Sequence, residues 1–460
     1  MNPFSIEPTG VCHVVAMPFP GRGHINPMMN LCKLLASKKP NILITFVVTQ
    51  EWLGYIGSDA KPDNIRFASI PNVIPPERLK AADFPGFYEA VMTKMEAPFE
   101  RLLDRLQTPV TAIVADVEVL WGVNVGFRRN IPVALFWTMP ANFITMLHYF
   151  NLSAKGKNLP LHLLVDGEED QLAKQIQGLS ANQVEDLQTV FRETNKRVTE
   201  LALDCILQVP KAQYLLLTSV YELEPQAMEK LKSQFPFPVY PIGPAIPYSE
   251  LDNHDISASN GDQNYLQWLN LQPKGSVLYV SLGSFLSVSS AQMDEIASGL
   301  CKSGVRFLWV ARAEASRLRE SCGQNGFVVP WCDQLKVLCH ASVGGFWTHC
   351  GWNSTLEAVF AGVPMLSFPL FLDQVPNSRQ IVEDWRVGWK VKRDRGVENL
   401  MKREEIAELV KRFMDGGSNE GKEIRERAKE VSGVCHKAIA KGGSSDTNLY
   451  AFIRDVTKGF

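Results

Sequence analysis

The densest group of residue types able to do chemistry lies between residues 331 and 374. It contains the segment His349-Cys-Gly-Trp-Asn-Ser, which follows an apolar, strand-like run and precedes a helical pattern. Asn353 and Ser354 therefore fall at a predicted helix N-terminus, where free backbone N–H groups and the positive end of the helix dipole bind phosphate. Because His349 can add another hydrogen-bond donor, the segment predicts a pyrophosphate site.

Two residues near this segment allow a functional and a structural interpretation. Glu357 lies three residues beyond Ser354 on the same helical face, where its carboxylate could accept hydrogen bonds from both hydroxyls of a ribose. The same Ser-Thr-Leu-Glu spacing is also a capping box, which would explain both residues by helix initiation alone. Trp331 is either a core aromatic residue or a surface on which a nucleobase stacks.

A second group of chemically capable residues lies in the first half of the chain. His24 follows a predicted strand in a Gly-Arg-Gly loop, and Asn26 and Pro27 suit the N-cap and first position of the next helix. Asp116 ends another predicted strand. The carboxyl ends of parallel strands are where ligands of such folds bind, although isolated residues of these types are more often structural.

Short apolar runs rich in β-branched residues, separated by helical patterns, must position both groups. Unbroken apolar strands that alternate with helices predict parallel sheets covered on both faces, hence an α/β fold. The helix formed around Ile406, Leu409, Val410 and Phe413 is expected to stop at the glycines 416–417. The predicted strands are residues 12–17, 42–48, 112–115, 132–136, 214–217, 277–281, 306–310, 343–346 and 364–368.

The best domain boundary lies between residues 244 and 262, where apolar periodicity is lost and turn formers accumulate. We expect a first domain of residues 1–244, a linker of 245–262 and a second domain of 263–440. Each half begins with a strand and a glycine turn, which predicts two nucleotide-binding folds with parallel sheets that face one another across a cleft. A final helix, within 441–460, could pack back on the first domain.

Taken together, residues 331–374 resemble the donor-binding signature box of plant family 1 UDP-glycosyltransferases in order and spacing. The resemblance covers most of the chain and implies a GT-B fold, in which an N-terminal Rossmann-like domain binds the acceptor and a C-terminal one binds the UDP-sugar. The sequence departs from the family where Asp333, not proline, precedes Gln334, and we expect only a local loop difference there. The other similar segments are Pro20–Met28, Thr218–Glu224, Tyr240–Pro244 and Tyr279–Ser284.

The resemblance also implies roles for individual donor-binding residues. Ser284 and Trp352 would approach the phosphate or the sugar, and Thr138 would contact the transferred sugar. A closing glutamine is associated in the family with glucose donors, whereas histidine is associated with galactose. The remaining roles are stacking on uracil for Trp331, fixing the nucleoside for Gln334, binding the diphosphate for His349, Asn353 and Ser354, binding ribose for Glu357, and binding sugar hydroxyls for Asp373 and Gln374.

The same resemblance assigns the catalytic base to His24 and the carboxylate that orients it to Asp116. A neutral imidazole with an ordinary pKa of about 6.5 is a suitable base at cytosolic pH. It would take the proton of an acceptor hydroxyl, whose oxygen attacks the anomeric carbon as UDP departs, so that an α-linked donor gives a β-glucoside. We expect no cofactor, since the UDP-sugar is a co-substrate, and no metal, since the sequence lacks an Asp-x-Asp pair.

No motif identifies the acceptor, but apolar side chains of the first domain are expected to contact it. The candidates are Phe19, Trp121, Met139, Phe143 and the segment 148–150. Aromatic residues in α/β domains are mostly core residues, so each candidate also has a purely structural interpretation. The family suggests a small hydrophobic acceptor, such as a phenolic, flavonoid or terpenoid, with a hydroxyl or carboxyl group.

The composition of the 460-residue chain excludes several other classes of protein. The 47 Lys+Arg against 49 Asp+Glu leave a net charge of −2, which offers no basic field for nucleic acid. Neither a signal peptide nor about 18 uninterrupted apolar residues are present, so we expect a cytoplasmic protein without membrane insertion. We also expect a monomer. The nine cysteines are odd in number, and the spacing of those at 322, 332, 339 and 350 fits no zinc motif.

Three competing functions remain to be weighed. An NAD-dependent dehydrogenase would need Gly-x-Gly-x-x-Gly after a strand, and the sequence after Gly21 lacks the third glycine. A sugar-nucleotide epimerase would not need an acceptor site. A catalytically silent sensor of UDP-sugars or small ligands on the same fold is the alternative from outside the enzymes, and the presence of both His24 and Asp116 argues against it.

Overall fold

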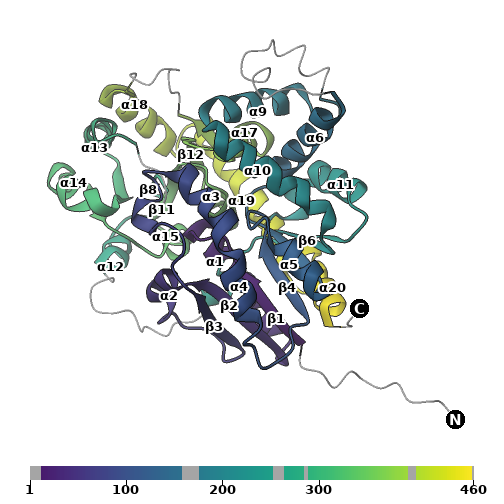
Figure 1. Ribbon diagram of the computed structural model, residues 1–460. Coiled ribbons are helices and arrows are strands. Elements are labelled where there is room, and N and C mark those ends of the chain that lie inside the picture. Colours follow the sequence, from purple (N-terminus) through teal and green to yellow (C-terminus); the bar gives the residue numbers. More distant parts are fainter. Residues whose placement is uncertain (1–11, 158–175, 252–263, 284–287, 392–399, 458–460) are drawn as a thin grey trace. The chain divides into compact units, whose positions relative to one another are not determined.

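The computed structural model describes residues 12–157, 176–251, 264–283, 288–391 and 400–457 (Figure 1). The chain divides into two compact units. The first unit comprises Met1–Ala245 and Ala438–Phe460, and the second comprises Ile246–Lys437. Ser284 and most of the predicted linker lie outside the described residues. No helix among the described residues is long and apolar enough to cross a membrane.

The first unit is built on a seven-stranded sheet with the order β3-β2-β1-β4-β5-β6-β7, in which every pair is parallel. Parallel strands are joined by helical crossovers that cover both faces of the sheet. The strands are β1 (Cys12–Met17), β2 (Ile42–Thr49), β3 (Ile65–Ile70), β4 (Ala112–Asp116), β5 (Val133–Trp137), β6 (Tyr214–Leu217) and β7 (Val239–Pro241).

The helices of the first unit alternate with these strands, and the C-terminal helix also belongs to it. That helix, α20 (Ser444–Thr457), packs on β7 and α1, and Asn448 donates a hydrogen bond of 2.9 Å to the carbonyl of Pro241. The other helices are α1 (Arg22–Lys38), α2 (Gln50–Ile56), α3 (Phe84–Lys94), α4 (Glu96–Leu103), α5 (Gly122–Arg129), α6 (Ala141–Lys157), α9 (Ala181–Glu193), α10 (Lys196–Gln208) and α11 (Pro225–Gln234).

The second unit contains a six-stranded parallel sheet with the order β10-β9-β8-β11-β12-β13. Its strands are β8 (Val277–Ser281), β9 (Arg306–Val310), β10 (Gly326–Val329), β11 (Val343–Thr348), β12 (Met365–Ser367) and β13 (Gly388–Lys390). Its helices are α12 (Asn264–Asn270), α13 (Ser290–Ser303), α14 (Ala315–Ser321), α15 (Gln334–Leu338), α16 (Trp352–Ala361), α17 (Gln374–Arg379), α18 (Arg403–Met414) and α19 (Asn419–Ile439).

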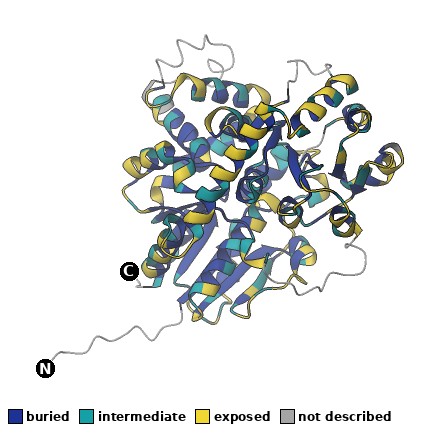
Figure 2. Ribbon diagram, turned by 180° about the vertical axis from the view of Figure 1, so that it is seen from behind, coloured by how far each residue is buried: buried dark blue, intermediate teal, exposed yellow. Residues whose placement is uncertain are grey.

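The α/β architecture with two parallel sheets confirms the fold class predicted from the sequence. In both units the central strands are buried, while the helices expose one side to solvent (Figure 2). The predicted helix around Ile406 is α18, whose Ile406, Val410 and Phe413 are buried and which ends at Met414. Because the sheets are covered on both faces, their carboxyl ends remain the places where polar groups can be presented.

The start of α1 differs from the prediction. The helix begins at Arg22 with Gly21 as its N-cap, so Asn26 and Pro27 are interior residues and not the N-cap and first position. The N–H of His24 already bonds to the carbonyl of Gly21 at 3.0 Å. Pro27 was misleading because one proline in an early turn removes only a single helical hydrogen bond, which the packed face of α1 can offset.

Candidate active site

His24 and Asp116 lie together at the carboxyl end of the first sheet. Strands β1 and β4 are parallel neighbours, with Met17 opposite Ala115, so the segments that follow them emerge side by side. Asp116 is the last residue of β4, and His24 is the third residue of α1. The imidazole Nδ1 is 2.9 Å from Oδ2 of Asp116, which is buried.

Thr138 completes the surroundings of the same ring nitrogen. Its Oγ1 is 3.0 Å from His24 Nδ1, so an N–H at Nδ1 has two oxygen acceptors within reach. This arrangement favours the tautomer that carries its proton on Nδ1 and leaves a lone pair on Nε2. The ring can then accept a proton from a ligand at Nε2. Thr138 was expected to contact a sugar, and here its hydroxyl faces the base.

Glu118 is a second acidic neighbour of His24, and the sequence analysis did not predict it. Its Oε2 is 3.5 Å from Nε2, and its side chain is only 10% exposed. Val117 and Glu118 form a turn directly after β4, so the alternation of side chains along a strand does not place Glu118. Its approach to His24 depends on the tertiary structure.

The charges around His24 raise its pKa. Burial lowers the pKa of this imidazole, but the negative charges of Asp116 and Glu118 outweigh burial and move it above the ordinary 6.5. The Lys80 ammonium acts in the opposite direction. Burial likewise raises the pKa of Glu118, with the charge of His24 opposing that shift. The site therefore holds a proton on His24 to a higher pH than an isolated imidazole would.

The four predicted acceptor contacts lie in different surroundings. Phe19 is buried, with its ring centroid 5.0 Å from that of His24. Met139, beside Thr138, is half-buried. Trp121 is a core residue whose indole N–H donates to the carbonyl of Val91, and Phe143 is also fully buried. Phe19, Trp121 and Phe143 are thus all deeply buried, and their contact with an acceptor stays a prediction.

The segment His148-Tyr149-Phe150, also considered for the acceptor, contributes to the core. His148 is buried against Phe235, with ring centroids 4.9 Å apart. Phe150 is buried against Phe191, with centroids 5.2 Å apart. Both rings are thus packed against other aromatic side chains of the first unit.

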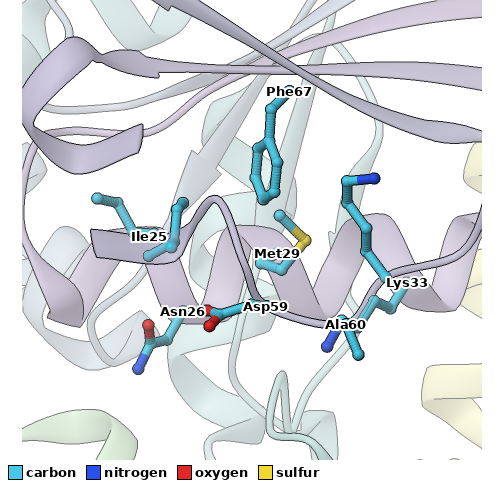
Figure 3. Close-up of a pocket in the computed structure, with 9 residues that line it drawn as sticks. Ile25, Asn26, Met29, Lys33, Asp59, Ala60 and Phe67 are labelled. Atoms are coloured by element: carbon cyan, nitrogen blue, oxygen red, sulfur yellow. The ribbon is translucent and has the colours of Figure 1, made fainter. Parts of the chain in front are cut away.

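A small cavity in the first unit lies apart from these groups (Figure 3). It lies between the Ile25, Met29 and Lys33 face of α1 and Phe67 of β3. Its volume is about 40 Å³, which is room for a few water molecules but not for a sugar or a phenol. Among the described residues, its lining does not include His24, Asp116 or Glu118, so it is not the candidate active site.

In the second unit, the turn between β11 and α16 forms the predicted phosphate-binding segment. Gly351 is the N-cap of α16, so Asn353 and Ser354 lie in the first turn of the helix. Glycine offers no side chain to cap this turn. Ser354 is thus the third helical residue and not an N-cap, and the capping-box interpretation of Ser354 and Glu357 is wrong. A helix that begins this way presents its N-terminal amides to an anion.

The imidazole of His349 is held between two glycines. A Cβ at Gly283 would lie 2.6 Å from its Nε2, and one at Gly351 would lie 2.4 Å from the same atom. Either contact is too close for a side chain, so both positions need glycine. Burial, with the nearby Arg312 cation, lowers the pKa of His349 to about 4, so the ring is neutral near pH 7.

Gln334, predicted to fix the nucleoside, is hydrogen-bonded to Glu357, predicted to bind the ribose, and to Ser354, predicted to bind the diphosphate. The amide nitrogen of Gln334 lies 2.8 Å from Ser354 Oγ and 2.6 Å from Glu357 Oε2. Tyr279 of β8, which the sequence analysis did not single out, donates its hydroxyl to Gln334 Oε1 at 3.1 Å. Burial raises the pKa of Glu357 to about 7, although the bond from Gln334 opposes that shift. Adjacent to this group, Trp331 leaves 55% of its surface exposed.

The unusual Asp333 has a structural explanation. Its carboxylate accepts the backbone N–H of Lys336 at 3.2 Å and caps α15, which begins at Gln334. Aspartate is among the preferred N-cap residues, so its side chain stabilises the start of this helix. That the difference from the family is only local stays a prediction.

The other residues predicted to bind the UDP-sugar make hydrogen bonds or ring contacts within the second unit. Asn377 donates to both Asp373 Oδ2 and the carbonyl of Cys350, at 2.8 Å each, and so ties α17 to the His349 turn. Gln374 Oε1 accepts the N–H groups of residues 370 and 371. Trp352 is buried against Trp385, with ring centroids 6.0 Å apart. Only its backbone is therefore available to a phosphate.

Comparison with known proteins gives one consistent family. Residues 188–418 match the family model described as "UDP-glucoronosyl and UDP-glucosyl transferase". UDP-glycosyltransferase 87A2 of Arabidopsis thaliana is 52% identical over 460 residues, covering 99% of each chain. 7-Deoxyloganetin glucosyltransferase of Catharanthus roseus is 33% identical and covers 96% of each chain.

Solved structures of similar fold contain UDP or UDP-glucose. Os79 of O. sativa in complex with UDP has a TM-score of 0.81 and 26% identity, covering 96% of this chain and all of that one. Medicago truncatula UGT71G1 complexed with UDP-glucose has a TM-score of 0.80 and 26% identity, covering 97% and 100%.

The two site histidines should titrate at different pH values, because their pKa values are shifted in opposite directions. In histidine-selective NMR of the unliganded protein, His24 is expected to titrate above pH 6.5, whereas His349 should titrate near pH 4. Asp116→Asn removes a negative charge beside Nδ1 and should lower the pKa of His24 while leaving His349 unchanged. An unchanged pKa of His24 in Asp116→Asn would show that the 2.9 Å hydrogen bond to Asp116 does not determine this pKa.

Proposed function

Because the chain belongs to the UDP-glucoronosyl and UDP-glucosyl transferase family, and is thus a UDP-dependent glycosyltransferase, we propose that it transfers glucose from UDP-glucose to a hydroxyl of a small hydrophobic acceptor. The observation that carries the proposal is the hydrogen bond between His24 Nδ1 and Asp116 at 2.9 Å. It supplies a base, and a carboxylate that orients the base, without a protein nucleophile.

In this mechanism His24 accepts the acceptor proton at Nε2. The freed oxygen attacks the anomeric carbon of glucose from the face opposite the phosphate, and the bond from that carbon to UDP breaks. Attack from the opposite face inverts the α-linked donor to a β-glucoside. The imidazolium formed is stabilised by Asp116, whose side chain is 1% exposed and therefore little screened by water.

Residues of the second unit are proposed to hold UDP. The first turn of α16, with Asn353 and Ser354, is suited to the negative charge that grows on the departing diphosphate. His349, held between Gly283 and Gly351, would contact the same group. A diphosphate next to this neutral ring would favour its protonated form, so that the ring can donate two hydrogen bonds. The protein itself thereby supplies charge stabilisation to the leaving group.

The nucleoside would be bound by the cluster around Gln334. Glu357, one oxygen of which accepts a hydrogen bond from Gln334, would also accept the ribose hydroxyls, and uracil would stack on the exposed ring of Trp331. Asp373 and Gln374 are the proposed contacts of the glucose hydroxyls. The choice of glucose rests on this closing glutamine and on the relatives named as glucosyltransferases.

The test is release of UDP from UDP-glucose, with UDP-galactose and UDP-glucuronate beside it, against a pool of phenols, alcohols and acids. Wild type should form a glycoside with UDP-glucose, and His24→Ala should lose about 10²- to 10⁴-fold in rate, the usual contribution of a general base. UDP should bind both proteins equally. Tight UDP-glucose binding with no product from any acceptor, in either protein, would instead indicate a sensor.

Replacing Trp331 tests the nucleoside site separately from catalysis. Stacking of a base on an aromatic ring contributes about 1–3 kcal/mol, so Trp331→Ala should weaken UDP binding about 10-fold or more by calorimetry. Leu271→Ala, at a side chain that is 81% exposed in the same unit, is the matched control and should leave the Kd unchanged. Equal affinities in the two variants would remove Trp331 from the proposed site.

A further inference from the structure

Glu118 places a second carboxylate beside the ring of His24. Its Oε2 lies 3.5 Å from Nε2, while Asp116 occupies the other ring nitrogen, Nδ1, at 2.9 Å. The backbone N–H of Glu118 donates to Asp116 Oδ1 at 3.0 Å, which fixes the two acidic residues relative to one another. Asp116 alone is enough to orient the base. The carboxylate at Nε2, the nitrogen that must receive the acceptor proton, therefore needs a different explanation.

The neighbours of Glu118 hold its carboxylate in a largely buried position. The Tyr88 hydroxyl hydrogen bonds to it, and this bond lowers its pKa while burial raises it. The Lys80 ammonium is a further nearby charge, held by the carbonyl of Pro20 at 2.6 Å and by the ring of Phe19. Phe19 packs edge-on against Tyr88, with ring centroids 5.3 Å apart.

This arrangement creates a competition for the proton of an acceptor hydroxyl. A hydroxyl has one proton to donate, so it can donate to His24 Nε2 or to Glu118, but not to both. The two acceptor atoms are 3.5 Å apart, and two oxygens on adjacent carbons are separated by about the length of one hydrogen bond. Two neighbouring hydroxyls can thus donate to the two atoms at the same time.

We propose that Glu118 determines acceptor specificity by accepting a hydrogen bond from a second hydroxyl next to the reacting one, so that catechols and vicinal diols are the preferred acceptors. The proposal rests on the transferase function proposed above. The reacting hydroxyl gives its proton to His24 Nε2, and the neighbouring hydroxyl keeps its own proton while it donates to Glu118. No covalent step is added to the reaction.

The same geometry discriminates against monoethers. An acceptor with a methoxy group in place of the second hydroxyl would cover the Glu118 carboxylate with a methyl group and give it no donor. Sites with a buried polar group reject analogues that leave this group unpaired far more strongly than they reject a change of size alone. Loss of one hydrogen bond to a charged group corresponds to a preference of about 10-fold or more.

The experiment measures kcat/KM for matched acceptor pairs, each a diol and its monomethyl ether. One pair is catechol and 2-methoxyphenol, a second is a flavonoid with a dihydroxylated ring and its ether, and a third is an aliphatic 1,2-diol and its ether. Wild type should prefer the diol about 10-fold or more, after correction for equivalent hydroxyls. Glu118→Gln, which keeps an acceptor oxygen but loses the charge, should reduce the preference. Glu118→Leu should abolish it.

Glu77→Gln is the control variant. Glu77 is another carboxylate near Lys80, at 3.8 Å from its Nζ, but it makes no ion pair with His24 among the described residues. It should keep the wild-type preference. An equal diol-to-ether ratio in wild type and both Glu118 variants, or turnover of ethers and simple alcohols alone, would overturn the proposal. Failure to glycosylate any acceptor would instead overturn the proposed transferase function.

Discussion

The hydrogen bond between His24 and Asp116 is the constraint on which the proposed chemistry of the first unit depends. It exists because β1 and β4 are adjacent and parallel, so that a residue at the end of one strand reaches a residue in the first turn of the helix that follows the other. Gly21 allows this turn to pass close to Lys80, since a Cβ there would lie 2.5 Å from the Lys80 ammonium. The buried carboxylate then selects the tautomer and raises the basicity of the ring.

In the second unit the candidate site is shaped mainly by backbone geometry, whereas charged side chains dominate the site of the first unit. Gly283 and Gly351 leave room for the His349 ring, and Gly351 also starts α16 without a side-chain cap. Asn377 then connects this turn to Asp373. A ligand at this turn would meet the His349 ring and the helix amides, with the Arg312 cation nearby. The proposed base thus depends on charge, and the proposed anion site depends on backbone geometry.

The sequence predicts the inner strands well and the edge strands not at all. All nine predicted strands are interior strands of the two sheets, while β3, β7, β10 and β13 are the edge strands and were missed. Interior strands are apolar on both faces, which leaves a clear signal. The missed strands are short or only partly buried, as the three-residue β7 and β13 show, so their sequences resemble loops.

The candidate site was predictable where a residue follows a strong strand, as Asp116 does, or belongs to the box from Trp331 to Gln374. The site was not predictable where contacts depend on the tertiary structure, as in the approach of Glu118 to His24 or of Tyr279 to Gln334.

The most direct test of the account is the kcat of Asp116→Asn, measured with the Kd for UDP. Loss of about 10³-fold or more in kcat with unchanged UDP affinity is expected if Asp116 orients the base. A kcat within a few-fold of wild type would contradict the account.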